Sequence, residues 1–165
     1  MNKSHFQMMA RYGAWANKRL AGACQSLSTE AYHKERGAFF GSIHGTLNHI
    51  LAGDRIWFGR ITGIDSGITS LDAQLFDTFD DLSQARENED LRIQTIIDEM
   101  TDQAYSGMLA YSLIVAPEPM NTPMSQVLTH VFNHATHHRG QVHTLLSQAA
   151  GDPPPLDLMY FLREA

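Results

Sequence analysis

Apolar residues recur at helical spacing in four long segments of the sequence. The segments cover residues 4–27, 42–61, 82–107 and 123–150, and each holds apolar residues three and four positions apart. Because about 3.6 residues complete one helical turn, this spacing gives each helix an apolar side that must be buried. The sequence therefore predicts an all-α fold, a four-helix bundle. It contains no recognisable linker or repeat, so residues 1–165 are expected to form a single domain.

A short extended segment is expected between the third and fourth helices. Residues 111–123 contain three prolines, and the sequence favours a turn at 117–119. Thr122 and Pro123 then suit the N-cap and the first turn of the fourth helix. Residues 63–81, which are rich in glycine and aspartate, are expected to form an irregular loop.

Composition limits the classes of function. The net charge of −6 disfavours a general nucleic-acid binder, which is normally basic. No apolar run reaches the roughly 18–20 residues of a membrane span. Arg11 interrupts the N-terminal apolar segment, which argues against a signal peptide, so a cytoplasmic location is expected. The single cysteine, Cys24, excludes an internal disulfide and a cysteine-rich zinc site, and its helical neighbours predict a buried structural thiol.

A second apolar stripe lies on the first helix. Met8, Tyr12 and Trp15 point away from the main apolar side. This stripe is either a subunit interface or the other half of a well-buried helix.

Histidines are concentrated in the fourth predicted helix. His130, His134 and His138 are each four residues apart and therefore lie along one face. A His-x-x-x-His pair allows two imidazoles to reach one metal ion, and His49 on the second helix offers a third from an otherwise apolar face. The alternative is a set of surface or core-edge histidines with ordinary hydrogen bonds.

Four sequence blocks resemble the DinB-like (damage-inducible) family of metal-binding four-helix-bundle proteins. They are "YGAWANKRL", "GTLNHILAGDRIWFGRI", "NHATHHRGQVHTLL" and "PPPLDLMYFL", they occur in the family's order, and the H-x-x-x-H-R-G-Q block is the most specific. The resemblance implies a divalent ion bound by His49, His134 and His138. It also implies a homodimer.

Four further residues are candidates for the surroundings of this ion. Asp54 lies in the apolar stripe of the second helix and needs a partner, either a ligand histidine or Arg139. His130 could line the pocket, and His137 is either close behind the ligands or in solvent. Arg139 either forms a structural ion pair or steers an anionic substrate.

The ligand count bears on function. Three neutral imidazoles leave open positions on the ion, which favours a catalytic or ligand-binding metal over a closed structural site. Imidazole suits zinc, nickel, copper or iron, and zinc or nickel is expected. The resemblance implies a transferase or isomerase that uses a small-molecule substrate and a low-molecular-weight thiol. The alternatives are a non-catalytic metal-binding stress protein and a metal-activated hydrolase.

Overall fold

The computed structural model describes residues 3–114, 118–149 and 153–164. Within these ranges the chain is mostly helical and carries one small two-stranded sheet. The described residues form seven helices, of which four are long and three are short. The prediction of a mainly helical chain is therefore confirmed, whereas the four-helix count is not, because three short helices accompany the four long ones in the described ranges. None of the helices in the described ranges has an apolar stretch long enough to cross a membrane.

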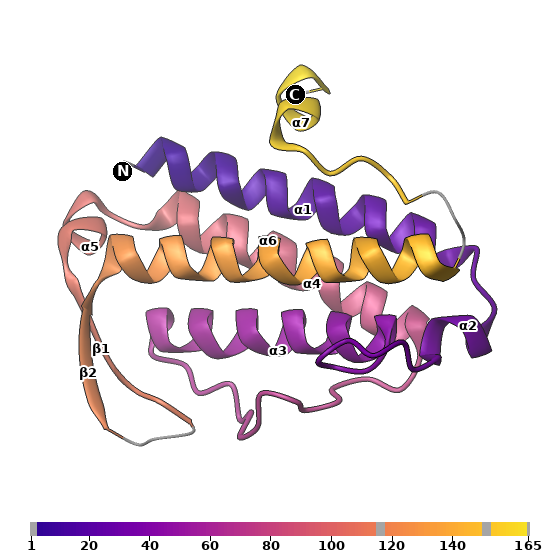
Figure 1. The fold of residues 1–165 in the computed structure, drawn as a ribbon. Helices are drawn as coiled ribbons and strands as arrows, with labels where there is room; N and C mark the ends of the chain where they lie inside the picture. The colour runs from indigo at the N-terminus through magenta and orange to yellow at the C-terminus, as the bar shows by residue number, and fades with distance from the viewer. Residues whose placement is uncertain (1–2, 115–117, 150–152, 165) are drawn as a thin grey trace.

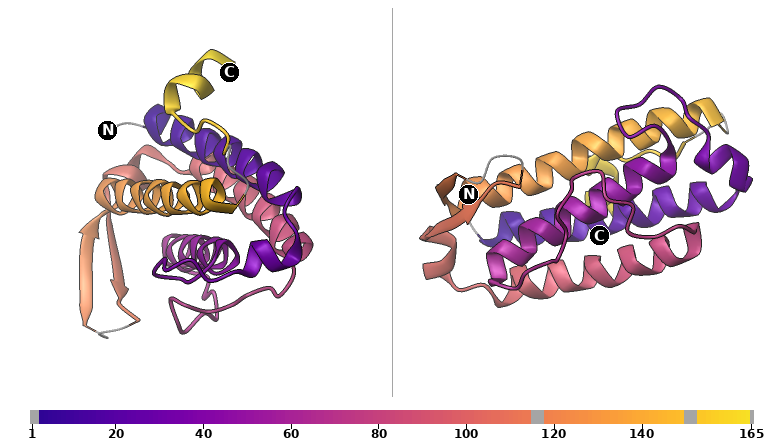
Figure 2. Two further views of the ribbon diagram at one scale, coloured as in Figure 1. Left: turned by 45° about the vertical axis from the view of Figure 1, so that its right-hand side comes forward. Right: turned by 90° about the horizontal axis from the view of Figure 1, so that it is seen from below.

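The long helices define the body of the molecule (Figures 1 and 2). They are α1 (Lys3–Gln25), α3 (Ile43–Thr62), α4 (Phe79–Glu99) and α6 (Met124–Ala149). The short helices are α2 (Thr29–His33), α5 (Asp102–Ser106) and α7 (Leu158–Glu164). Helix α1 packs against α4 and α6, and α3 packs against the same two helices. Helix α6 therefore has neighbours on two sides, α1 on one and α3 on the other.

The ends of α3 match the sequence prediction for residues 42–61. The Ser42 hydroxyl accepts a hydrogen bond from the backbone N–H of Gly45 at 3.1 Å and caps the first turn. Gly63 ends the helix with a φ of 74°, in the left-handed region that favours glycine. Both capping signals lie at the ends of the segment that apolar spacing had indicated.

The third predicted helix, residues 82–107, is divided in two. Helix α4 begins earlier, because the Thr78 hydroxyl accepts a hydrogen bond from Asp81 N. It ends before Met100, which has an extended backbone. The Thr101 hydroxyl then caps α5 by accepting a hydrogen bond from Ala104 N. Two capping threonines thus set boundaries that apolar spacing does not reveal.

The extended segment before α6 is a β-hairpin. Strand β1 (Met108–Ser112) pairs antiparallel with β2 (Pro119–Pro123), as expected for an extended connection. The prediction that Thr122 and Pro123 start the last long helix is wrong, because both pair within the hairpin. Helix α6 instead begins at Met124, whose N–H donates to Gly107 O. Positions 117 and 150, part of the predicted turn and the predicted helix end, lie outside the described residues.

The core lies between the long helices. Every one of them contributes a fully or almost fully buried apolar side chain, for example Phe6, Phe58, Ile97 and Leu128. Deleting one such large side chain typically costs about 2–5 kcal/mol. This packing holds α3 and α6 in a fixed relation, which matters for the histidines they carry.

The chain's own C-terminal segment covers much of the second apolar stripe on α1. The Tyr12 hydroxyl donates to Leu156 O, and Trp15 Nε1 donates to a Glu164 carboxylate oxygen, each at 2.8 Å. The Phe161 ring lies about 6 Å from both aromatic rings. Tyr12 is buried and Trp15 is half-buried, so they face their own tail. This contact explains the stripe without a subunit interface.

Candidate metal centre

Three imidazole rings from two helices converge beside the core. His49 comes from α3, and His134 and His138 come from successive turns of α6. His49 Nε2 lies 3.1 Å from His134 Nε2 and 3.2 Å from His138 Nε2. The nearest ring nitrogens of all three lie within 4.8 Å of one another, so they could hold one metal ion. The residues expected to meet from the sequence do meet.

Hydrogen bonds fix the direction of two of these rings. The Nδ1–H of His49 donates to Leu71 O at 2.6 Å, and the Nδ1–H of His138 donates to Gln141 Oε1 at 2.8 Å. In a neutral imidazole the other nitrogen then carries a lone pair. Two unprotonated Nε2 atoms, each with a lone pair, therefore lie 3.2 Å apart and repel each other. A cation between them would turn this repulsion into attraction.

The spacing of the nitrogens fits a transition metal ion. Metal–nitrogen bonds of about 2.0–2.1 Å, at tetrahedral or octahedral angles, set neighbouring ligand nitrogens about 2.9–3.4 Å apart. The two measured Nε2 separations of 3.1 and 3.2 Å lie within this range. The donor set also fits, because neutral imidazole is a common ligand of zinc and nickel.

The surroundings keep the three rings neutral. Burial, together with the neighbouring imidazoles of His138 and His49, lowers the pKa of His134 to about 3. Burial also lowers the pKa of His49 and of His138. A histidine must lose its second proton before it can bind a metal ion, so this environment favours the ligating form.

Two glycines allow the close packing around the histidines. A Cβ at Gly53 would lie 3.1 Å from His134 Cε1, so the absence of a side chain leaves room for that ring. A Cβ at Gly45 would collide with the Phe40 carbonyl oxygen. Gly45 thereby lets the preceding loop approach α3, where the Phe40 ring stacks on His49 at 3.7 Å between centroids. Phe40 forms one wall of the site.

Several of these neighbouring residues were not predicted from the sequence. Gln141 is three residues after His138 and Gly53 is four residues after His49, so helical spacing could have found both. Leu71 and Phe40 lie in irregular loops, where spacing carries no information about position. Asn48 anchors the loop that contains Leu71, because its side-chain oxygen accepts hydrogen bonds from the backbone N–H groups of residues 75 and 76.

The two other histidines of interest border the site without joining the cluster. The His130 ring is exposed, and it packs against Trp57 at 5.0 Å and against His134 at 5.8 Å between centroids. His137 is exposed, and its Nε2 lies 3.2 Å from Gln141 Nε2. The Gln141 amide therefore connects His137 with His138.

Asp54 and Arg139 lie elsewhere than expected. Asp54 is buried and has a partner, as its position required, but the partner is Arg86 of α4, at 2.6 Å, rather than a ligand histidine or Arg139. Arg86 also approaches Asp90 at 2.9 Å. Arg139 lies over the Tyr12 ring, 5.3 Å from its centroid. Arg139 thus belongs to the contact of α6 with α1, and the ion pair of Asp54 with Arg86 belongs to the contact of α3 with α4.

Comparisons with known proteins agree with the sequence blocks. A sequence model of the DinB family matches residues 1–165. The chain is also similar to Protein DinB of Bacillus subtilis (strain 168), with 29% identity over 167 residues. That match covers 92% of this chain and 90% of the relative. Both matches span the two helices that carry the three histidines.

Proposed function

Because this chain belongs to the DinB family, we propose that it is a metal-dependent transferase or isomerase. In this proposal His49, His134 and His138 bind a divalent transition metal ion, zinc or nickel. A low-molecular-weight thiol serves as cosubstrate for a second small molecule. The reaction takes place in the cytoplasm, where thiols are kept reduced.

One observation carries the metal proposal. The unprotonated Nε2 atoms of His49 and His138 lie 3.2 Å apart, and hydrogen bonds to Leu71 and Gln141 hold both rings in place. Such an arrangement is unfavourable without a cation. Ligand histidines in metal sites commonly donate their second N–H to a carbonyl or a similar acceptor, as both rings do here.

The donor set supports an open site. A bound divalent ion with three imidazole ligands would stabilise a thiolate or polarise a carbonyl group. The chain supplies the orientation, through Leu71 and Gln141, and one aromatic wall, through Phe40. Its own thiol is unsuited to the chemistry, since Cys24 is buried and burial raises its pKa to about 12. The reacting thiol must therefore come from solution.

Metal content tests the ligand set. We expect His49→Ala, His134→Ala and His138→Ala each to lose stoichiometric metal in elemental analysis of the purified protein. His143→Ala is the control, because it removes an imidazole from the same helix outside the cluster. Full metal content in His134→Ala would refute the assignment.

Spectroscopy of cobalt-substituted protein tests the thiol cosubstrate. An added thiol should produce a thiolate-to-cobalt charge-transfer band that saturates, that persists in Cys24→Ser and that is lost in His138→Ala. If small anions such as azide change the spectrum and thiols do not, the thiol proposal fails and a metal-activated hydrolase gains support. If neither changes it, the site is closed and the non-catalytic function gains support.

The homodimer remains a prediction from the family resemblance. The apolar stripe first considered as its interface is largely covered by the C-terminal segment, so we propose an interface outside this stripe. Light scattering should give about twice the chain mass of 18.5 kDa at micromolar protein. A monomer mass would contradict the prediction.

A further inference from the structure

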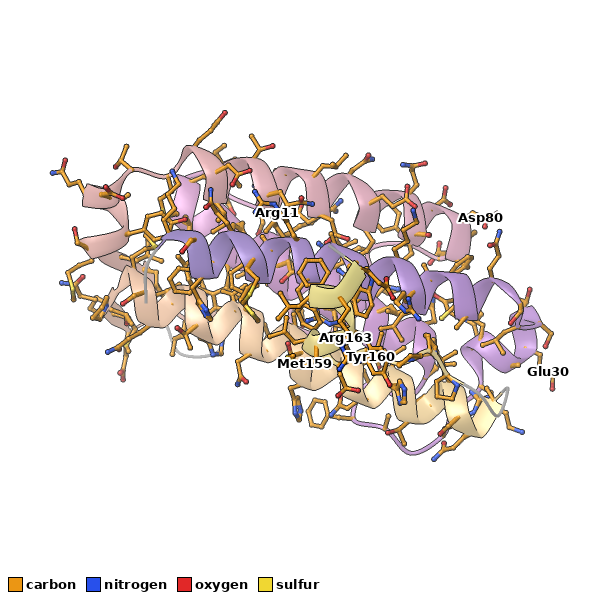
Figure 3. All side chains as sticks on the ribbon, turned by 90° about the horizontal axis from the view of Figure 1, so that it is seen from above. Arg11, Glu30, Asp80, Met159, Tyr160 and Arg163 are labelled. Atoms are coloured by element: carbon orange, nitrogen blue, oxygen red, sulfur yellow. The ribbon has the colours of Figure 1, made fainter. Side chains whose placement is uncertain are left out.

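A cleft lies on the side of α6 turned away from the histidine cluster. It has a volume of about 750 Å³ and opens between α1, α6 and the segment that leads into α7. Thr136, Gly140 and His143 line it, and helical periodicity places them opposite His134. Figure 3 shows α7, with Met159 and Tyr160 labelled, lying over the seam between α1 and α6.

Arg139 contributes a buried positive charge to this cleft. The residue is only 3% exposed, and its guanidinium lies over the Tyr12 ring. Arg139 Nη2 donates to the Thr136 hydroxyl at 3.0 Å, while Nε has no hydrogen-bond partner. Among the described residues, no carboxylate lies within ion-pair distance of Arg139, since Asp54 and its neighbours pair with other arginines.

A buried guanidinium without an ion pair is energetically unfavourable. An anion that reached the guanidinium would compensate the charge directly. The planar fork of arginine suits carboxylate and phosphate groups, which it can bind through two parallel hydrogen bonds.

The remaining walls indicate what else the ligand contains. Met9, Pro155 and Leu156 form an apolar side next to the Tyr12 ring, and half-buried His143 is a further polar group. One acidic residue, Asp157, also lines the cleft, but it is exposed. Such a lining suits a molecule with one anionic group and a compact apolar body.

We propose that this cleft binds a small organic anion. Its carboxylate or phosphate group lies against the Arg139 guanidinium, and its apolar body lies against Tyr12 and Leu156. None of the three clustered histidines lines this cleft, so anion binding here does not depend on the proposed metal ion.

Four probes separate the contributions of charge and apolar body. Benzoate and phenyl phosphate carry both, benzyl alcohol carries the body alone, and inorganic phosphate carries the charge alone. Binding to the full-length protein is followed by amide chemical shifts in NMR, with and without a chelator, because an anion could also reach a metal ion. We expect benzoate or phenyl phosphate to shift the amides of Thr136, Gly140 and His143 equally in both conditions. Benzyl alcohol and inorganic phosphate should bind at least about tenfold more weakly.

A matched pair of glycine variants tests the location. A Cβ at Gly140 meets nothing within 4 Å and Gly140 lines the cleft, so the side chain of Gly140→Leu starts in open space there. A Cβ at exposed Gly22 of α1 is equally free and lies outside this cleft, so Gly22→Leu is the control. We expect Gly140→Leu to weaken binding of the anionic probe at least about tenfold and Gly22→Leu to leave it unchanged.

A charge variant tests the role of the guanidinium. Arg139→Met keeps much of the side-chain volume and should abolish the preference for benzoate over benzyl alcohol. If that variant does not fold, the glycine pair still decides the question. Equal binding to Gly140→Leu and Gly22→Leu would overturn the proposal. So would equal binding of benzyl alcohol and benzoate, or no saturable binding of either aromatic anion at millimolar concentration.

Discussion

Gly53→Ala should strengthen the helix and weaken the metal centre at the same time. In the middle of a helix, alanine is more favourable than glycine by up to about 1 kcal/mol. The new methyl group, however, would lie 3.1 Å from His134 Cε1. Carbon atoms prefer a separation of about 3.5–4.0 Å, so the ring or the helix must move by about 0.4–0.9 Å.

That displacement exceeds what a metal site tolerates. Ligand distances are normally held within about 0.2 Å of their preferred values. Disturbing the orientation of one ligand typically costs about 10- to 100-fold in metal affinity, or about 1.4–2.7 kcal/mol. We therefore expect Gly53→Ala to bind zinc about 10- to 100-fold more weakly than the unsubstituted protein.

Two measurements on one set of proteins check this reasoning. Competition with a chromophoric chelator gives the zinc affinity, and thermal unfolding of the metal-free protein gives its stability. Gly22→Ala is the control, because its Cβ meets nothing within 4 Å and it should gain helix stability without losing zinc affinity. A zinc affinity for Gly53→Ala within about twofold of the control would show that His134 does not need the space at Gly53.

Three other substitutions or treatments have defined outcomes. Gln141→Leu removes the acceptor for His138 Nδ1–H and should lower zinc affinity about 10- to 100-fold in the same competition assay, whereas an unchanged affinity would remove Gln141 from the site. Arg86→Met leaves Asp54 buried without its partner, so denaturant unfolding should show a loss of about 3–5 kcal/mol, and a loss below about 1 kcal/mol would contradict the ion pair's role. Burial and a pKa of about 12 should make Cys24 react with iodoacetamide far more slowly in the folded protein than in urea, and equal rates would show an accessible thiol.

The sequence predicted those parts of the fold that depend on local signals. The apolar spacing of residues 42–61 located α3 closely, and the structure shows its caps at Ser42 and Gly63. The start of α4 and its division from α5 were not predicted, because they depend on the capping hydroxyls of Thr78 and of Thr101, and neither residue interrupts the apolar pattern. The hairpin register was not predicted either, because a threonine at position 122 is as compatible with a helix N-cap as with its observed place in the strand, where it pairs with Leu109.

In the histidine cluster, too, local spacing predicted some features, and others depend on how the helices pack. His134 and His138 share a helix face, so their proximity followed from spacing alone. The approach of His49 depends on how α3 packs against α6, and the family resemblance supplied that information. The partner of Asp54 could not be predicted, because Arg86 belongs to a third helix and no periodicity relates the two. Leu71 and Phe40 come from loops whose paths depend on the finished fold.

The division of the histidines between two helices links metal release to unfolding. His49 and His134 are separated by 85 positions in the chain. Closing a loop of that length in a disordered chain costs about 4–5 kcal/mol of entropy at room temperature. The unfolded chain would therefore keep only the neighbouring pair on the α6 segment as an easily formed chelate. An ion bound by all three imidazoles would leave as the two helices separate, so its binding free energy would add to the resistance of the native chain to heat.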